Sequence, residues 1–331
     1  MTRPLPNAST ARTALATLVA LAIALPVGAA HAQDAFPARP ATIVVPFPPG
    51  STSDLLPRAI APALSQALGV GVVVENRPGA GGSVGAAFAA RARADGHLIL
   101  MAPTPVLAVN QWLYKDLAYS PEKDFAPITN AATTPNLLVV HPSVAAASLR
   151  ELVELAKKQP LAFASGGGGT TSHLCGELLR ALAKVDLTHV PYKGPGPAVQ
   201  DLLAGRVPMM CDNFSNVIPH VRAGKLRAIA LADKARHAQA PDVPTGAEAG
   251  LPGFEAGVWY SFVAPAGTPR SAIERWNAEI GKALKSPQLA ERLRDLGLAV
   301  IADSPEDFAR FIAAEAAKWK RVVEVSGAKV D

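Results

Sequence analysis

Two short segments carry the residue types that bind an anion without a charged side chain. Loop 1 (47–54, FPPGSTSD) lies between an apolar strand-like run and a helical pattern that extends to about residue 68. Loop 2 (165–173, SGGGGTTSH) lies between a second such run and a helix that extends to about residue 182. The first N–H groups of a helix are unpaired and lie at its positive end, so each loop offers an anion site. Two such loops in one chain predict a ligand held between two lobes.

Single polar residues near these loops add to the candidate site. Asp212 follows the apolar run at 207–211, and the carboxyl ends of parallel strands face the ligand crevice of an open sheet. Asp54 lies at a helix start, where an acidic residue contributes about 0.3–1 kcal/mol through the dipole. Its carboxylate could also accept a hydrogen bond from a ligand.

Catalytic and metal-binding patterns are missing from the sequence. It contains no G-x-S-x-G, P-loop, H-E-x-x-H or C-x-x-C motif, and its seven histidines do not have metal-ligand spacing. His173 could act as a base for a nearby serine, but nothing else in the pattern supplies a nucleophile and an orienting acid. We therefore expect no catalytic residue, no metal and no cofactor.

The N-terminal residues 1–32 read as a secretory signal peptide. A positive start without acidic residues precedes an apolar stretch at 14–25 that is too short to span a bilayer, and a small-residue cleavage site ends at Ala32. We expect cleavage near Ala32 and a periplasmic protein. The whole chain has a formal net charge of +5 and no run of basic residues, so we do not expect a nucleic acid partner.

The cysteines leave two alternatives open. Cys175 and Cys211 are the only cysteines of the chain, and in an oxidising exported compartment they can pair. The sequence does not fix their separation. Two buried free thiols are the alternative that we favour slightly.

Strand-like and helical patterns alternate along the chain. Apolar spacing predicts helices at 149–158 and 273–284, and an amphipathic helix from 305 to about 325 whose apolar stripe serves packing. Repeated strand–helix units predict an α/β fold with two mostly parallel sheets flanked by helices.

The ordered set of short motifs resembles the tripartite tricarboxylate transporter receptors, also called Bug extracytoplasmic solute receptors. The matching segments occur in family order over nearly the whole chain after the signal, and they include 45–50, 74–82, 123–128, 189–194, 224–228 and 264–269. The resemblance implies a two-lobed periplasmic binding protein fold of type II character with a two-strand hinge. It implies one lobe at 33–130 plus 257–331 and the other at 131–256.

The resemblance also implies a site that holds carboxylates through loop N–H and hydroxyl groups rather than through an arginine clamp. Carried over by position, the expected ligand-binding residues are Phe47, Gly50, Ser51, Thr52, Asp54, Thr104, Ser165, Gly166, Gly168, Thr170, Thr171, His173 and Asp212. The family usually has a second glycine where this chain has Ser51. We expect this side chain to narrow loop 1 and to add a hydroxyl donor.

We therefore expect a monomeric periplasmic receptor that delivers a small organic acid to integral-membrane permease subunits. The ligand would be a mono-, di- or tricarboxylate or an acidic amino acid. Two alternatives are an exported enzyme that acts on a small acid through His173 and a sensor subunit for a membrane kinase.

Overall fold

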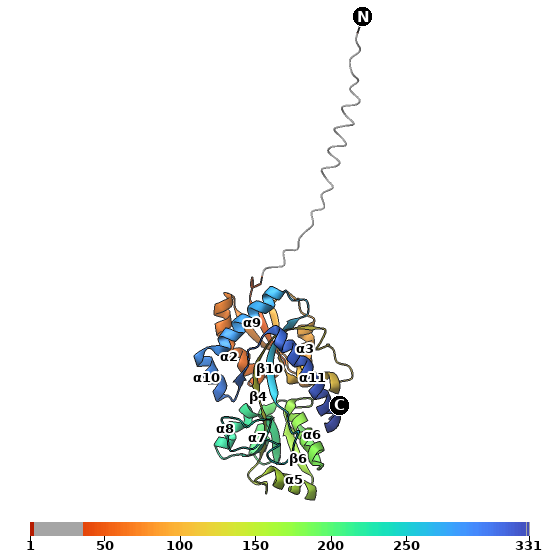
Figure 1. Ribbon diagram of the computed structural model, residues 1–331, viewed down its shortest axis with the longest axis vertical. Helices are drawn as coiled ribbons and strands as arrows, with labels where there is room; N and C mark the ends of the chain where they lie inside the picture. Colours follow the sequence, from red (N-terminus) through yellow and green to blue (C-terminus); the bar gives the residue numbers. More distant parts are fainter. Residues whose placement is uncertain (3–35, 329, 331) are drawn as a thin grey trace. The chain divides into compact units, whose positions relative to one another are not determined.

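A computed structural model describes residues 1–2, 36–328 and 330 of the chain (Figure 1). The predicted signal peptide and its cleavage site therefore lie outside the described residues, apart from the first two. Phe36–Asp331 form one compact unit, and its strands form two sheets. We call the part built on the six-stranded sheet the larger lobe and the part built on the five-stranded sheet the smaller lobe.

The larger lobe has the strand order β11-β4-β10-β3-β1-β2. β1 pairs in parallel with β2 and β3, whereas β10 runs antiparallel to β3 and β4, and β11 runs antiparallel to β4. The bounds are β1 Ala41–Val45, β2 Val72–Asn76, β3 Leu98–Pro103, β4 Phe125–Thr134, β10 Val258–Pro265 and β11 Ala299–Val300.

The helices of the larger lobe cover both faces of this sheet (Figure 1). α2 buries Leu56, Ile60 and Leu64, which are spaced by one turn, in a core shared with Trp276 and Ile280 of α9. The bounds are α2 Thr52–Leu68, α3 Ser83–Ala90, α4 Asn110–Leu113, α9 Arg270–Lys285, α10 Pro287–Asp295 and α11 Pro305–Ser326, with short turns η1 Ala80–Gly82 and η2 Pro105–Val109.

The smaller lobe has the strand order β7-β6-β8-β5-β9. β6 pairs in parallel with β7 and β8, and β5 runs antiparallel to β8 and β9. The strands are β5 Asn136–Val140, β6 Leu161–Ser165, β7 Leu187–Pro191, β8 Met209–Asn213 and β9 Arg227–Ala232. The helices are α5 Leu149–Lys158, α6 Thr171–Ala183, α7 Pro195–Leu203 and α8 Phe214–Arg222.

Two adjacent strands of the larger sheet lead into and out of the smaller lobe. β4 ends at Thr134 and β5 starts two residues later, while the chain returns to the larger lobe at the start of β10. α11 packs against β4 and η2 and also reaches the smaller lobe, where Arg180 Nη2 of α6 donates to Ser326 O at 3.0 Å. The lobe boundaries near residues 130 and 257 stay a prediction.

The two-lobed α/β fold and its flanking helices agree with the expectation, but both sheets are mixed rather than mostly parallel. The reason is that β4 and β10 in the larger sheet, and β5 in the smaller one, run against their neighbours as the chain passes between the lobes. The apolar stripe of α11 packs as predicted, because Phe308 and Trp319 are fully buried. None of the helices in the described part of the chain has the length and apolar character needed to cross a membrane.

Candidate ligand-binding site

Loop 1 is held in place by hydrogen bonds to Asp54. Gly50 occupies the left-handed region at φ 80°, which a glycine adopts without strain, and its N–H donates to Asp54 Oδ2 at 2.9 Å. Arg58 Nε and Asn76 Nδ2 each donate to Asp54 Oδ1 at 2.8 Å. Asp54 is 2% exposed, and these donors occupy both of its oxygens. Its carboxylate therefore organises the loop rather than facing a ligand.

Ser51 fits loop 1 without strain. Its φ of −70° lies in the extended region, so this position does not require a glycine. Its Oγ donates to Pro48 O at 2.8 Å. The hydroxyl is therefore not the free donor that we expected, since its proton is already used within the loop, although the residue does line the cavity described below.

Loop 2 depends on glycine flexibility and on a helix cap. Gly167 and Gly169 have φ values of 124° and 78°, which turn the chain from β6 into α6. Thr170 is the N-cap of α6: its Oγ1 accepts from the His173 N–H at 3.3 Å and donates to Gly167 O at 2.7 Å. The sequence predicted this helix start, and the cap fixes the direction in which the first-turn amides point.

The two loops meet at a small cavity of about 50 Å³. Six of the thirteen predicted ligand-binding residues line it, from both lobes: Phe47, Ser51, Gly166, Thr170, Thr171 and Asp212. The lining is completed by Ser53, Pro103, Pro105, Ser172, Pro195, Asn213, Asn216, Val258 and Tyr260. Loop 1 and loop 2, which are more than 100 residues apart in the sequence, therefore share one cavity.

Other predicted residues support the cavity from outside it. Thr52 Oγ1 lies 2.8 Å from Ser215 Oγ at the start of α8, a contact that joins the two lobes. Thr104 Oγ1 accepts from the Trp259 N–H at 2.9 Å and so ties the end of β3 to β10. Beyond these two, the predicted residues that do not line the small cavity are Gly50, Asp54, Ser165, Gly168 and His173.

Five polar residues of the cavity were not predicted. One is Ser172, which lies within loop 2 beside the predicted Thr171. Asn213 and Asn216 follow Asp212 in the chain. The end of the apolar run at 207–211, which predicted Asp212, would have identified them too. Ser53 lies within loop 1 but was passed over for its neighbours. Tyr260 occurs in the apolar strand β10, and nothing in that run distinguishes it, yet its Oη accepts from Asn213 Nδ2 at 2.6 Å.

Asp212 is the one acidic side chain of the cavity lining. It is 3% exposed, and Asn216 Nδ2 donates to its Oδ2 at 3.0 Å. Burial raises the pKa of this carboxyl to about 6, opposed by hydrogen bonds from the Asn216 side chain and the Asn213 backbone. Among the described residues no lysine, arginine or histidine forms an ion pair with it.

His173 lies behind the cavity wall and is kept neutral. Its ring stacks on the ring of His189 at 4.0 Å between centroids, and its Nδ1 accepts from the Gly169 N–H at 3.2 Å. Burial lowers the pKa of His173 to about 3, with further lowering by His189 and Arg180, and burial lowers the pKa of His189 to about 4. His189 Nε2 is in turn 2.6 Å from Ser165 Oγ, so the pair supports the start of loop 2.

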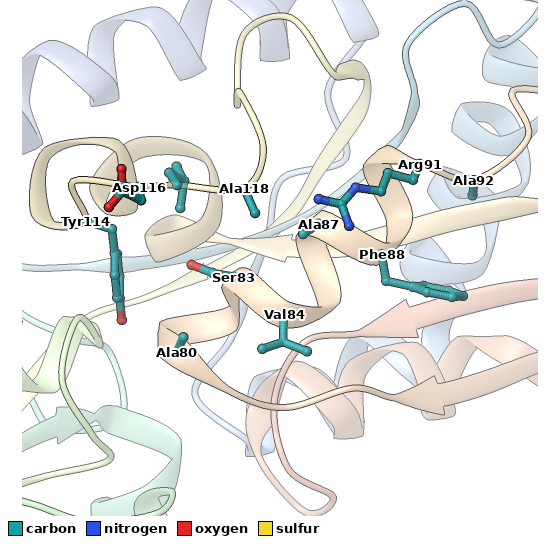
Figure 2. Close-up of a pocket in the computed structure, with 11 residues that line it drawn as sticks. Ala80, Ser83, Val84, Ala87, Phe88, Arg91, Ala92, Tyr114, Asp116 and Ala118 are labelled. Atoms are coloured by element: carbon teal, nitrogen blue, oxygen red, sulfur yellow. The ribbon is translucent and has the colours of Figure 1, made fainter.

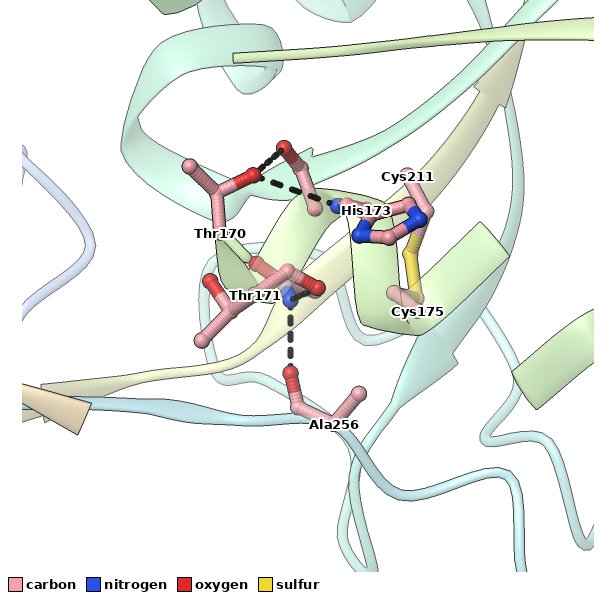
Figure 3. Close-up of a disulfide and its surroundings, with 8 residues drawn as sticks. Thr170, Thr171, His173, Cys175, Cys211 and Ala256 are labelled. Carbon is pink, nitrogen blue, oxygen red and sulfur yellow. Dashed lines mark hydrogen bonds between the residues drawn. A yellow bond between two sulfur atoms is a disulfide. The ribbon is translucent and has the colours of Figure 1, made fainter. Parts of the chain in front are cut away.

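The two cysteines form a disulfide, so the interpretation as free thiols is wrong. Cys175 on α6 and Cys211 on β8 have Cα atoms 5.9 Å apart, and both side chains are buried (Figure 3). The pairing depends on α6 packing over the smaller sheet, which the sequence did not reveal. The disulfide joins the helix that carries Thr171 to the strand that carries Asp212.

A cleft of about 810 Å³ adjoins the small cavity and shares Phe47, Gly166 and Thr170 with it. Residues 78–82 and Tyr114 line it from the larger lobe, and residues 191–194 line it from the smaller lobe. Gly168, a predicted site residue, lies here, and a side chain at this position would meet Val330 Cγ1 at 2.9 Å. The cleft is large enough for the body of a small ligand whose end enters the small cavity.

A further cavity of about 590 Å³ lies along α3 and is lined by none of the predicted residues. Figure 2 shows Val84 and Phe88 on α3 and Arg91 just after it, with Tyr114 and Asp116 on the opposite wall. Its lining is mostly apolar and contains neither anion-binding loop. We therefore place the functional site at the small cavity and its adjoining cleft.

Comparison with known proteins identifies the family of this chain. The family described as tripartite tricarboxylate transporter family receptor matches residues 56–328. BugT of Bordetella pertussis is 38% identical over 311 residues, which cover 93% of this chain and 94% of BugT.

Two solved structures from Rhodopseudomonas palustris are also similar. One protein, solved with adipate, is 36% identical with a TM-score of 0.85, over 89% of this chain and all of that one. MatC, solved with bound malate, is 37% identical with a TM-score of 0.82, over 87% of this chain and all of MatC.

Proposed function

Because the chain belongs to the tripartite tricarboxylate transporter receptor family, we propose that it captures a small organic acid between its two lobes in the periplasm. The acid is a mono-, di- or tricarboxylate or an acidic amino acid. We further propose that the protein is a monomer, that it reaches the periplasm through a signal peptide cleaved near Ala32, and that it delivers the acid to integral-membrane permease subunits.

The observation that carries this proposal is the convergence of two helix N-termini, from different lobes, on one cavity. α2 starts at Thr52 and α6 at Thr171, and residues of both first turns line the cavity. The first amides of each helix have no helical acceptor, and each dipole favours an anion by about 0.3–1 kcal/mol or more where solvent is excluded. Among the described residues no lysine or arginine lines the small cavity, so these amides and the nearby hydroxyls are the groups available to a carboxylate there, while Lys193 lines the adjoining cleft.

The geometry around His173 supports binding rather than catalysis. The ring is buried, its Nδ1 is occupied by the Gly169 N–H, and it does not line the small cavity. Ser165, which contacts the other histidine, is fully buried and is bonded within loop 2. A general base must reach a proton of the bound substrate, and neither histidine lines the small cavity. His189 lines the adjoining cleft, but its Nε2 already contacts Ser165 Oγ at 2.6 Å. We therefore propose that the protein is not an enzyme.

The solved relatives support the choice of ligand class. The two similar structures hold adipate and malate, which are both dicarboxylates. The cleft beside the small cavity leaves room for the remainder of an acid of this size.

The test is a thermal unfolding screen of the purified protein with mono-, di- and tricarboxylates and acidic amino acids. A ligand at a hundredfold excess over its Kd adds about 2.7 kcal/mol to the free energy of unfolding, which raises Tm by several degrees. Neutral sugars of similar size are the control. A rise in Tm with a sugar, and with none of the acids, would show that the proposed ligand class is wrong.

A further inference from the structure

The small cavity is unusual for an anion site because it also contains a buried carboxylate. Asp212 is 3% exposed, lines the cavity, and receives hydrogen bonds from the Asn216 side chain and the Asn213 backbone but no cation. An unpaired buried charge costs several kcal/mol unless further partners satisfy it. Among the described residues Asp212 therefore lacks a cationic donor that would offset its charge.

A second acceptor beside the cavity also lacks a donor. The Asn213 amide nitrogen donates to Tyr260 Oη, whereas its Oδ1 is buried and has no hydrogen-bond partner among the described residues. Asn213 lines the same cavity as Asp212 and follows it in the chain. An unsatisfied buried acceptor costs about 1–3 kcal/mol, so this amide oxygen next to a buried carboxylate without a cation indicates a site completed by another molecule.

The hydrogen-bond donors of the cavity and these two acceptors come from different elements of the fold. The first turns of α2 and α6 supply amides without helical acceptors, and the hydroxyls of Ser53 and Thr171 line the cavity without a hydrogen bond to another described residue. The acceptors come from the end of β8. The cavity thus provides donors for an anionic group and acceptors for a donor group of the same ligand.

We propose that the ligand is a carboxylic acid that carries a hydroxyl or ammonium group close to its carboxylate, and that Asp212 accepts the hydrogen bond from that group. The inference rests on the proposed function and narrows its ligand class, since a plain carboxylic acid adds a second negative charge beside Asp212 and supplies no further donor to either acceptor. Hydroxyl and ammonium groups offer the same donor chemistry, and the arms of the test separate them.

The test uses isothermal titration calorimetry to compare the Kd values of matched acids for the purified mature protein. The probes are three trios: propionate, lactate and alanine; succinate, malate and aspartate; glutarate, 2-hydroxyglutarate and glutamate. A hydrogen bond to a charged group favours the donor-bearing acid by about tenfold to a hundredfold in Kd over its plain partner. The hydroxy and amino members of the preferred trio then identify which donor the site takes.

Asp212→Asn is the matching variant, because it keeps the shape of the side chain and removes its charge. It is expected to reduce the preference for the donor-bearing acid by about tenfold or more, and to bind the plain acid no worse than the native protein does. Asp303→Asn is the control: Asp303 is also an acid whose pKa burial raises, but it accepts from the Asn130 N–H in the larger lobe and lines neither cavity of the site. Its preference among the acids should match that of the native protein.

Each outcome decides the question, even if Asp212→Asn does not fold, because the trios test the native protein. Equal or tighter binding of the plain acid in every trio that binds overturns the inference and leaves the carboxylate receptor intact. A donor preference that survives in Asp212→Asn overturns the assignment to Asp212. If no acid binds here and the thermal screen of mono-, di- and tricarboxylates also shows no rise in Tm, the proposed function fails and the inference fails with it.

Discussion

The disulfide offers the most direct quantitative test of the structure. Cys175 and Cys211 are 36 residues apart in the sequence and join α6 to β8 within the smaller lobe. Both side chains are buried, so the perturbation is to reduce the bond in the unfolded chain, or to replace both residues by alanine.

The expected magnitude follows from the closed loop. A crosslink limits the unfolded chain, and for a loop of 36 residues the chain-entropy relation gives about 3.8 kcal/mol at 25 °C. Reduction leaves the two sulfur atoms in the core, so it adds little loss of packing. The double alanine variant also loses buried volume, and its free energy of unfolding should fall by somewhat more.

Urea unfolding followed by circular dichroism, with and without a reducing agent, measures this difference. Thiol titration of the denatured protein reports the state of the cysteines in each sample. The double alanine variant is the control, because a reducing agent should not change its unfolding curve. Two titratable thiols in the untreated protein, or equal stability of the oxidised and reduced protein, would refute the reasoning.

Three further predictions concern the site. Thr171→Val should weaken acid binding by about 0.5–1.5 kcal/mol in calorimetry, with little change in the unfolding curve. Thr170→Ala should instead remove the N-cap of α6 and lower the free energy of unfolding by about 1 kcal/mol. The reverse pattern would show that the two residues have each other's role. Burial lowers the pKa of His173 from 6.5 to about 3, so the folded state favours the neutral ring. The contribution of His173 to the free energy of unfolding is therefore complete above pH 6.5 and is lost as pH falls towards 3. In urea unfolding measured at several pH values, His173→Asn should reduce the slope on the acid side by up to about 1.4 kcal/mol per pH unit. An unchanged slope would contradict that assignment. Ligand should reduce the radius of gyration in solution scattering and protect the amides of loops 1 and 2 from hydrogen exchange, because both loops line one cavity; protection of a single loop would argue against capture between the lobes.

The sequence by itself determined the local elements and the chemistry of the two loops. The helix at 149–158 has the bounds predicted from its apolar spacing, and α6 starts within loop 2, as the sequence predicted. These features depend on contacts between residues a few positions apart, and such contacts leave a pattern in the sequence. The same local logic predicts an anion site at both helix N-termini.

Only the tertiary structure decided which polar groups face the cavity. Asp54 and Asp212 both lie near a helix start in the sequence, yet Asp54 is fully used by Gly50, Arg58 and Asn76, whereas Asp212 has no cationic partner in the described chain. The difference is set by residues that arrive from other strands, and spacing along the chain carries no record of them.

The disulfide and the contact of Tyr260 also depend on how distant elements pack together. The cysteines pair because α6 packs over β8, and Tyr260 reaches Asn213 because β10 of the larger lobe starts beside the end of β8 of the smaller one. A sequence pattern reports the faces of each element, but the distance between two elements depends on how the whole core packs. The two anion-binding loops were therefore determined locally, and the acceptor groups that complete the site were determined by the packing of one lobe against the other.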